Sequence, residues 1–414
     1  MVKEQIILKF IRPVCLLATM LNVSNVIAAG IDAGDQGVSP GAEGGALTWE
    51  ASVGLGYDSN IYQAPDNSYK DYFFTPSVDV DPVTRSGFFI PVKLDGTYEN
   101  QLNASNILST NYQFSGNFYV DRDYSNADVS SHTINIGDRY VLNEKGRLQD
   151  SIYGGIILIK KEDEYTERDT GLDKETSAQE DISARYNFTG TGIELEYKKR
   201  TSKIKYGVKF KRLVRDYEDA VAISELDHTY TSLSGDVKFP VSKSSKLKLK
   251  YKHSVYDYDD RHARDATGFL SNANNPLLEY VYDEYILSYF YKFSRNLRTY
   301  FDYSFKTRSD EYVGYNDYDR NKYKVRALYD YSKDIALKAA FTYWERDYPN
   351  AYAFDNDTRE AKNYDGIKLE LEGDYTVTEN KTYWLDFEWR DENSTDKRYE
   401  YDRMKIMAGI KLSN

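Results

Sequence analysis

Hydrophobic and polar residues alternate along most of this chain with a period of two. In residues 47–57, one set of alternate positions reads Leu, Trp, Ala, Val, Leu, Tyr, and the other reads Thr, Glu, Ser, Gly, Gly. Successive side chains of a β-strand point to opposite faces, so such a segment is a strand with one apolar and one polar face. The pattern predicts an all-β protein from Leu47 onward.

The alternation recurs to the end of the chain and predicts about 18 strands. They fall at 47–57, 71–80, 86–98, 107–121, 130–142, 148–160, 178–189, 191–200, 203–215, 228–239, 245–257, 278–293, 297–308, 321–331, 335–346, 362–375, 380–390 and 399–412. Short turns and long loops must alternate along the chain if they lie at opposite ends of a barrel. With 18 strands, the short turn at 143–146 and the long loop at 161–177 would break this alternation, whereas 16 strands preserve it. We therefore expect an antiparallel barrel of 16 to 18 strands, with 18 favoured by the strand list.

Two architectures use strands of this kind. A soluble sandwich buries its apolar faces against each other. A transmembrane barrel turns them to lipid and its polar faces to a lumen. The strands continue over residues 47–414, which is too long for one sandwich, and Tyr and Trp gather near strand ends. Short turns also alternate with long polar loops, so the transmembrane barrel is favoured.

The N-terminus reads as a secretory signal peptide. Lys3, Lys9 and Arg12 precede a short apolar run at 14–21, and small or apolar residues stand before a cut after about Ala28. This arrangement is typical of a cleaved export signal. We expect a signal peptide at 1–28, a Gly-rich flexible periplasmic lead-in at 29–46, and an outer-membrane barrel at 47–414.

Composition removes several classes of function. The chain carries 40 Tyr, a single Cys and a formal net charge of −12. A nucleic-acid binder needs a basic face, and a disulfide framework or a Cys-based metal cluster needs more cysteines. No apolar run long enough for a transmembrane helix follows the N-terminus. A tyrosine-rich, polar, exported chain is typical of an outer-membrane barrel.

Charged residues stand in rows on the predicted lumen faces. Two interpretations are open: the rows form a track for an anionic polymer, or they pair across strands and keep the wall wet. The aromatic residues Tyr300 and Trp384, on the same faces, either stack on sugar rings or are structural. The rows comprise Lys203, Lys205, Lys209, Lys211, Lys246, Lys248, Lys250, Lys252, Glu370, Glu372, Asp374, Asp386 and Glu388.

Catalysis is not expected. His132, His228, His253 and His262 are scattered along the chain, with no Gly-x-Ser-x-Gly string and no metal-ligand spacing. A nucleophilic or metal-dependent site needs such groups in a defined constellation. We therefore expect no enzymatic activity and no cofactor.

The segment 54–62, Gly-Leu-Gly-Tyr-Asp-Ser-Asn-Ile-Tyr, resembles a family of bacterial outer-membrane barrels associated with exopolysaccharide or capsule biosynthesis. In that family a Gly-Tyr-Asp-x-Asn string closes the first strand; here it is Gly56, Tyr57, Asp58, Asn60 and Tyr62. The resemblance implies an 18-stranded barrel that completes polymer export together with a periplasmic polysaccharide-export protein. For Asp58 and Asn60 we expect a capping role after the first strand.

Together these features predict an integral outer-membrane barrel with an aqueous passage, most naturally for a secreted polysaccharide. Its partners would be outer-membrane lipid, the polysaccharide and a periplasmic export protein. Two other functions remain open: a general or oligosaccharide-uptake porin, and a structural or adhesive barrel whose long loops face outward. A barrel of 16 or more strands is wide enough to hold water, which favours transport.

Overall fold

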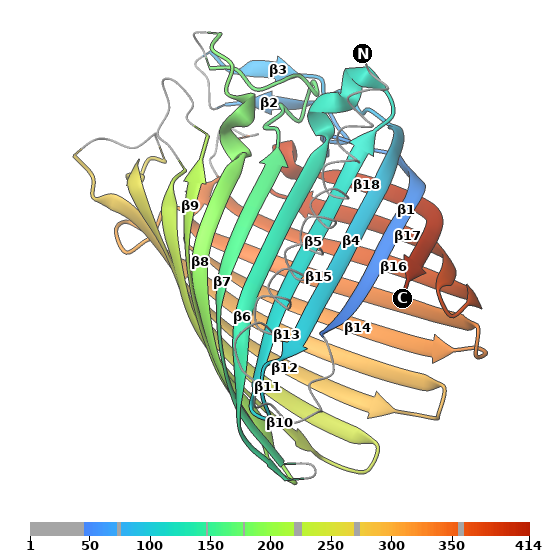
Figure 1. The fold of residues 1–414 in the computed structure, drawn as a ribbon. Helices are drawn as coiled ribbons and strands as arrows, with labels where there is room; N and C mark the ends of the chain where they lie inside the picture. The colour runs from blue at the N-terminus through green and yellow to red at the C-terminus, as the bar shows by residue number, and fades with distance from the viewer. Residues whose placement is uncertain are drawn as a thin grey trace, which may run out of the picture.

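The part of the chain described by the computed structural model forms one closed antiparallel barrel of 16 strands (Figure 1). The described residues are 45–72, 76–145, 148–176, 179–218, 226–268, 274–354 and 360–414. The predicted signal peptide and all but the last two residues of the predicted lead-in lie outside them. Consecutive strands pair with each other, and β1 closes the sheet by pairing with β18.

The barrel strands are mostly 13 to 18 residues long, which is enough to cross a bilayer at a tilt. They are β1 Ala46–Asp58, β4 Gly87–Gln101, β5 Asn106–Tyr119, β6 Val129–Lys145, β7 Leu148–Asp163, β8 Phe188–Arg200, β9 Lys205–Tyr217, β10 His228–Pro240, β11 Ser245–His262, β12 Leu277–Lys292, β13 Leu297–Ser309, β14 Tyr318–Asp330, β15 Ile335–Tyr352, β16 Ala361–Thr378, β17 Lys381–Ser394 and β18 Tyr401–Ser413.

The favoured count of 18 strands was wrong, because two predicted strands belong to loops. In place of a strand at 71–80, β2 (Tyr69–Asp71) and β3 (Val78–Val80) pair only with each other, above the barrel. Pro76 and Pro82 flank β3 and have no N–H to donate to a ladder, so this segment cannot extend into a wall strand.

The second wrongly predicted strand, at 178–189, contains a short 3-10 helix, Ser183–Tyr186, before β8 begins. Polar side chains bend the backbone there. Asp181 accepts a hydrogen bond from the Ser183 N–H at 2.8 Å, and Asn187 accepts one from the Asp163 N–H at 2.8 Å. Such local side-chain bonds compete with strand pairing. The described residues contain no helix long and apolar enough to cross a membrane.

The outer surface of the barrel is apolar. On the barrel strands other than β5, the large exposed hydrophobic residues occupy the alternate positions that face away from the lumen. Because only lipid makes such a continuous apolar belt stable, the all-β transmembrane barrel predicted from the alternation is confirmed. Examples from around the wall are Leu55, Ile156, Leu195, Val208, Leu233, Leu249, Phe301, Val325, Phe341, Leu371, Leu385 and Ile406.

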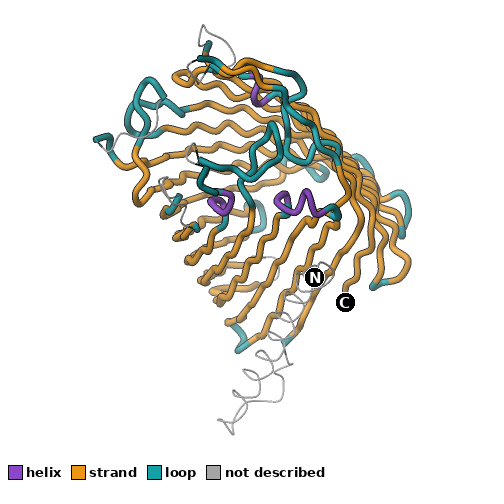
Figure 2. Tube along the Cα trace, turned by 90° about the horizontal axis from the view of Figure 1, so that it is seen from above, coloured by secondary structure: helices purple, strands orange, loops and turns teal. Residues whose placement is uncertain are grey.

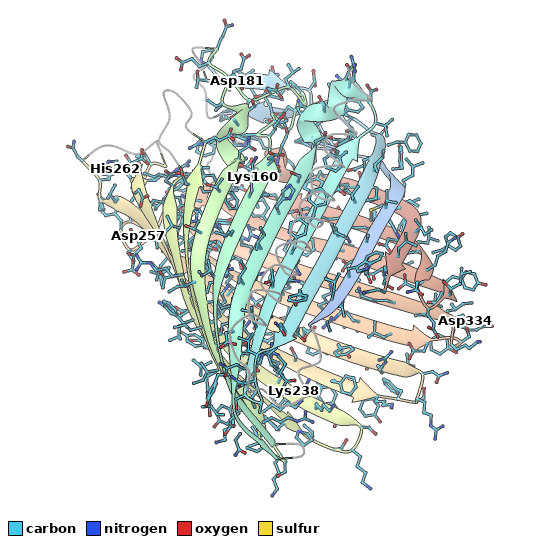
Figure 3. The ribbon with its side chains drawn as sticks, viewed as in Figure 1. Lys160, Asp181, Lys238, Asp257, His262 and Asp334 are labelled. Carbon is cyan, nitrogen blue, oxygen red and sulfur yellow. The ribbon has the colours of Figure 1, made fainter. Side chains whose placement is uncertain are left out.

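The two ends of the barrel differ. Short turns join the strands at one end, where the first and last strands also begin and finish, and long loops join them at the other. Figure 3 shows Lys238 at the turn end and Asp181 and His262 at the loop end. In outer-membrane barrels the short turns face the periplasm and the long loops face outward.

The seam between β1 and β18 is locked by side chains at the turn end. The Asn414 amide accepts a hydrogen bond from the Trp49 N–H at 2.8 Å and donates one to the Leu47 carbonyl at 2.8 Å. Farther along, Gly54 faces Gly409 directly, and a Cβ on either would lie 2.7 Å from the Trp384 ring. The absence of side chains on these two glycines allows the ring to lie against the seam.

The orientation of the wall is testable at Val325, which faces lipid between lumen-facing Lys324 and Arg326. Val325→Lys puts a charge into the apolar belt and should destabilise the barrel by about 2–4 kcal/mol. Leu328→Lys, on the lumen face of the same strand, is the matched control and should change stability little. Urea unfolding in detergent measures both; equal costs would contradict the orientation.

Candidate functional site: the interior of the barrel

Lysines form a ladder on the lumen face of β9, β10 and β11. Lys205, Lys209 and Lys211 alternate with exposed Val208 and Val214 on β9 and therefore point inward. On β11 the inward positions carry Lys246, Lys248, Lys250 and Lys252. The register places Lys238 of β10 beside both Lys205 and Lys248. The structure thus gathers the two predicted basic rows into one continuous surface.

Lys203 does not belong to this ladder, contrary to the prediction from alternation. It lies in the turn before β9, because Thr201 folds the chain there. The Thr201 hydroxyl accepts hydrogen bonds from the N–H of Lys203 at 3.4 Å and of Ile204 at 3.0 Å. Such local side-chain bonds favour a turn over strand pairing, so β9 begins two residues after Lys203, at Lys205.

The predicted acidic residues lie on the lumen face of β16 and β17, where several are paired with cations. Glu370 contacts Lys324 at 2.8 Å and Lys368 at 3.2 Å. Glu388 contacts Lys368 at 2.8 Å, and Glu372 bonds Lys338. Asp374 lies 3.8 Å from Lys411. Asp386 faces the lumen between them, opposite Glu372 and Met407. Charge on this side of the wall is largely balanced.

The lysine ladder of β9 to β11 has fewer ion pairs than the acidic side of the wall. Lys209 pairs with Glu194 at 2.6 Å and Lys248 with Asp236 at 3.5 Å. Among the described residues, no carboxylate lies within 4.0 Å of the ammonium groups of the six other ladder lysines: Lys205, Lys211, Lys238, Lys246, Lys250 and Lys252. Charges are therefore paired on β14 to β17, while β9 to β11 carry unbalanced positive charge.

Tyrosines line the loop half of the lumen in a continuous series of ring contacts, which we call the tyrosine belt. Successive ring centroids lie 4.9, 5.0, 6.5, 5.5, 5.7 and 5.4 Å apart. Most pairs meet edge to face, the favoured geometry for aromatic rings. The belt runs across β10 to β16 and ends before β18; its members are Tyr230, Tyr256, Tyr282, Tyr318, Tyr348, Tyr364 and Tyr399.

Cations stand against the faces of these rings. On β13, which adds no ring, Lys306 lies 4.2 Å from the Tyr282 centroid and Arg308 lies 4.5 Å from that of Tyr318. Farther round, Arg346 lies 5.0 Å from Tyr318 and Lys362 lies 3.8 Å from Tyr399. The quadrupole of a ring attracts a cation without cancelling its charge. The belt therefore holds positive charge at the loop end.

Neither of the aromatic residues singled out in the sequence belongs to this belt. Tyr300 lies nearer the turn end, 4.9 Å beneath the Arg326 guanidinium and 5.1 Å from the Phe290 ring. Trp384 covers the glycine pair at the seam, and its buried indole Nε1 has no hydrogen-bond partner among the described residues. Both rings face the lumen and pack against neighbouring side chains or glycines of the wall.

Within the motif at 54–62, Asp58 is the centre of a buried cluster of charges. It is fully buried at the loop end of β1, where it forms a salt bridge with Arg403 of β18 and lies 3.5 Å from Lys405. Tyr119 of β5 donates a hydrogen bond to it at 2.7 Å. Gly56 lies beneath the Phe89 ring, which a Cβ there would meet at 2.5 Å. The motif thus ties β1 to strands on both of its sides.

The remaining motif residues fix the start of the first loop. The Asn60 amide donates hydrogen bonds to the carbonyls of Ala64 at 2.9 Å and Asp402 at 3.1 Å. The Tyr62 hydroxyl donates to Asn126 at 2.6 Å, and burial raises the pKa of Tyr62 to about 12. Tyr57 faces outward, where its ring contacts Phe88. These contacts support the barrel and bring no reactive group together.

Loops from distant strands meet over the mouth, in the region where Figure 2 shows loops lying inside the ring of strands. The loop after β1 donates a backbone hydrogen bond from Val83 to Asp169, in the loop after β7, at 2.8 Å. It donates another from Tyr72 to Phe354, in the loop after β15, at 2.7 Å. We call this set of contacts the loop bridge; it narrows the mouth.

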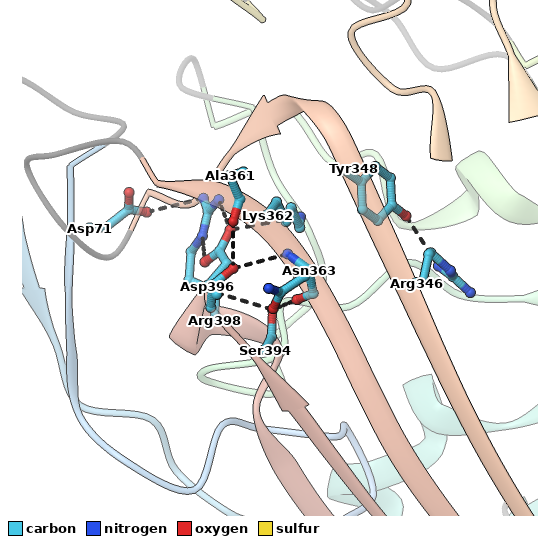
Figure 4. A network of polar contacts seen from close by, with 10 residues as sticks. Asp71, Arg346, Tyr348, Ala361, Lys362, Asn363, Ser394, Asp396 and Arg398 are labelled. Carbon is cyan, nitrogen blue, oxygen red and sulfur yellow. Dashed lines mark hydrogen bonds and ion pairs between the residues drawn. The ribbon is translucent and has the colours of Figure 1, made fainter. Parts of the chain in front are cut away.

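An ion cluster joins the loop bridge to the wall (Figure 4). Arg398 donates hydrogen bonds to fully buried Asp396 at 2.8 and 2.7 Å and lies 3.8 Å from Asp71, in the loop after β1. Burial disfavours the charged guanidinium, but the bonds to Asp396 outweigh burial and raise the pKa of Arg398. Lys362, of the wall, lies 3.7 Å from Asp396.

The four histidines have separate surroundings. His132 bonds Tyr112 and His253 bonds Asp283, each at 3.0 Å, while His228 and His262 bond backbone carbonyls. Among the described residues, no group of three or more His, Cys, Asp or Glu is arranged to hold a metal ion.

Comparison with known proteins finds similar solved structures among outer-membrane proteins. No protein-family model and no curated protein matches it. The chain is similar to the outer-membrane expressed OmpT of Vibrio cholerae, with 9% identity, a TM-score of 0.45, and coverage of 91% of this chain and 99% of that chain. It is also similar to the anion-selective porin from Comamonas acidovorans, with 9% identity, a TM-score of 0.47, and coverage of 89% and 99%.

Removing Asp58 should weaken the seam. Asp58→Ala leaves Arg403 and Lys405 buried without their carboxylate, which costs about 3–5 kcal/mol for a buried pair. The control is Glu50→Ala, at an exposed pair 3.9 Å from Lys411, with an expected cost of about 0–1 kcal/mol. Unfolding of both variants in detergent is compared by the mobility shift of heated and unheated samples; equal midpoints would refute the role given to Asp58.

Removing Arg398 should loosen the loop bridge and leave the wall intact. Arg398→Gln loses charge-assisted hydrogen bonds, each of which contributes about 1.5–3 kcal/mol. Hydrogen–deuterium exchange should rise in residues 59–72 and 395–400 and stay unchanged in the barrel strands. The control is Arg122→Gln, at an exposed loop arginine. Exchange that stays as slow as in the wild type would show that another contact holds the bridge.

Proposed function

We propose that the protein is an outer-membrane channel that carries a secreted polysaccharide from the periplasm to the cell surface. The observation that carries the proposal is the lumen wall, whose charged, hydroxyl and aromatic side chains run from the turn end to the loop end. Sixteen strands enclose a lumen wide enough for water. Polar groups on its wall replace water around sugar hydroxyls, so passage needs no cofactor.

Two further features support a saccharide as the transported substrate. Tyrosine presents an apolar ring and a polar hydroxyl on one side chain, which matches the mixed surface of a sugar ring. The segment 54–62 resembles barrels associated with exopolysaccharide and capsule biosynthesis. A periplasmic export protein would deliver the polymer to the turn end, and outer-membrane lipid would surround the apolar belt.

A small-solute porin is the second candidate, and the loop bridge favours it. Loops that meet over the mouth leave less room for a polymer, whereas ions and short oligosaccharides need little. The two functions make different predictions for a strain that lacks the gene. Loss of surface polymer favours export, while intact surface polymer with reduced uptake of small solutes favours the porin.

The test combines the deletion strain with the purified barrel. Deletion should abolish surface polysaccharide, measured in cell washes, and expression of the wild-type gene should restore it. The purified protein in planar bilayers should open stable conductance steps, because the lumen holds water and ions. Normal surface polymer in the deletion strain would refute export, and a barrel that conducts no ions would refute an open aqueous channel.

A further inference from the structure

The lumen wall is electrically asymmetric. From β9 to β14 the inward carboxylates among the described residues are Asp236, Glu284, Asp302 and Asp330. Each lies within 3.5 Å of a cation, and the partners are Lys248, Arg320, Arg326 and Arg298 in the same order. Two further inward cations, Lys209 and Lys324, pair with Glu194 of β8 and Glu370 of β16. The other inward cations of this sector have no carboxylate within 4.0 Å in the described part of the chain: Lys205, Lys211, Arg215, Lys238, Lys246, Lys250, Lys252, Lys292, Lys306, Arg308 and Lys322.

At the turn end this sector begins in a pocket of about 390 Å³. Five of its lining residues are inward cations from β6, β8, β9 and β10, and Asp236, already paired with Lys248, is the carboxylate among them. Lys238 stands at the turn-end rim of the barrel (Figure 3). The five inward cations are Arg139, Lys198, Arg200, Lys205 and Lys238, of which Lys198 pairs with Glu196 at 2.6 Å; outward-facing Lys199 also lines the pocket.

At the loop end the same sector runs into the tyrosine belt. There Lys306 and Arg308 are held against ring faces. Since a ring stabilises a cation without neutralising it, these charges remain available to an anion. The buried Nε atoms of Arg215, Arg320 and Arg346 have no hydrogen-bond partner among the described residues, which leaves donors unused along this wall.

The opposite wall lacks this excess of positive charge. A second pocket of about 390 Å³, on β1, β4, β5 and β6, is lined by two carboxylates, Glu50 and Asp95, by one cation, Lys93, and otherwise by uncharged residues. On β16 and β17 the cations are matched by the carboxylates described above. A chain with a formal net charge of −12 therefore concentrates unbalanced positive charge on one side of its lumen.

We infer that this sector, from the turn-end pocket over the lysine ladder to the tyrosine belt, is a binding track for a saccharide that carries anionic groups, such as sugar carboxylates. This inference rests on the proposed function and adds the charge of the substrate. One-signed charge on low-dielectric walls concentrates counter-ions. Lysines that repeat at every second residue offer an anionic chain successive equivalent contacts as it moves.

The test uses the purified full barrel and oligogalacturonate, with a neutral maltooligosaccharide of equal length as reference. Wild-type channels in a KCl gradient should prefer chloride, and oligogalacturonate should block them where the neutral oligomer does not. Replacing Lys246, Lys248, Lys250 and Lys252 by Gln should lower chloride preference. It should also weaken the block by about tenfold or more, the loss expected for even one charge-assisted contact.

The matched control removes four lysines outside the lumen and outside the turn-end pocket, Lys160, Lys243, Lys333 and Lys381, also by Gln. It lowers the total charge equally and should leave selectivity and block unchanged. If the ladder variant fails to assemble, the triple variant Arg200→Gln, Lys205→Gln and Lys238→Gln tests the turn-end pocket with the same readouts. Unchanged selectivity in an assembled lumen variant, or equal changes in the control, would overturn the track.

Binding separates this inference from the proposed function. Calorimetry of oligogalacturonate with the detergent-solubilised barrel needs no current and no export. Binding that is lost in the ladder variant and falls with added salt supports the track even if the deletion strain retains its polymer. Undetectable binding to a wild-type barrel that conducts ions refutes the track and leaves the channel standing.

Discussion

A sheet that closes on itself with a period of two assigns each wall side chain either to lipid or to the lumen. Shifting one strand by a single residue would turn its whole apolar face inward, so the register of every pair is fixed by the same constraint. The backbone is satisfied by ladders on both sides of each strand, which leaves side chains of the lumen face free to determine function. The charge pattern of β9 to β17 is therefore a property of the wall as a whole.

The wall holds cations in two physically different ways. On β14 to β17, Lys324, Lys338 and Lys368 meet carboxylates, and their charges cancel locally. On β13, the cations Lys306 and Arg308 meet tyrosine faces. Ring faces allow cations to be packed closely in a partly dry wall while their charge still reaches the lumen. This difference explains how an acidic chain has a lumen with a basic side.

Alternation alone was sufficient to predict the fold class, the outward belt and most strand positions, because each depends on one strand at a time. It failed where local chemistry overrides periodicity, as at Pro76 and Thr201. The tyrosine belt was missed for another reason: Tyr282, Arg308 and Tyr318 become neighbours only once the registers of β12, β13 and β14 are known. Sequence also could not show which charges pair, since Glu370 meets Lys324 across 46 residues.

Stability is distributed unevenly between wall and mouth. Each barrel strand is held by continuous hydrogen-bonded ladders, whereas the loop bridge depends on a few backbone contacts and on the ion cluster at Arg398. Local opening in proteins draws on segments with the fewest such contacts. The Asp58 cluster lies between the two regions and fixes the base of the first loop to β18 and β5. The charge pattern of the lumen therefore depends on the ladders of the wall and not on the few contacts that hold the loops together.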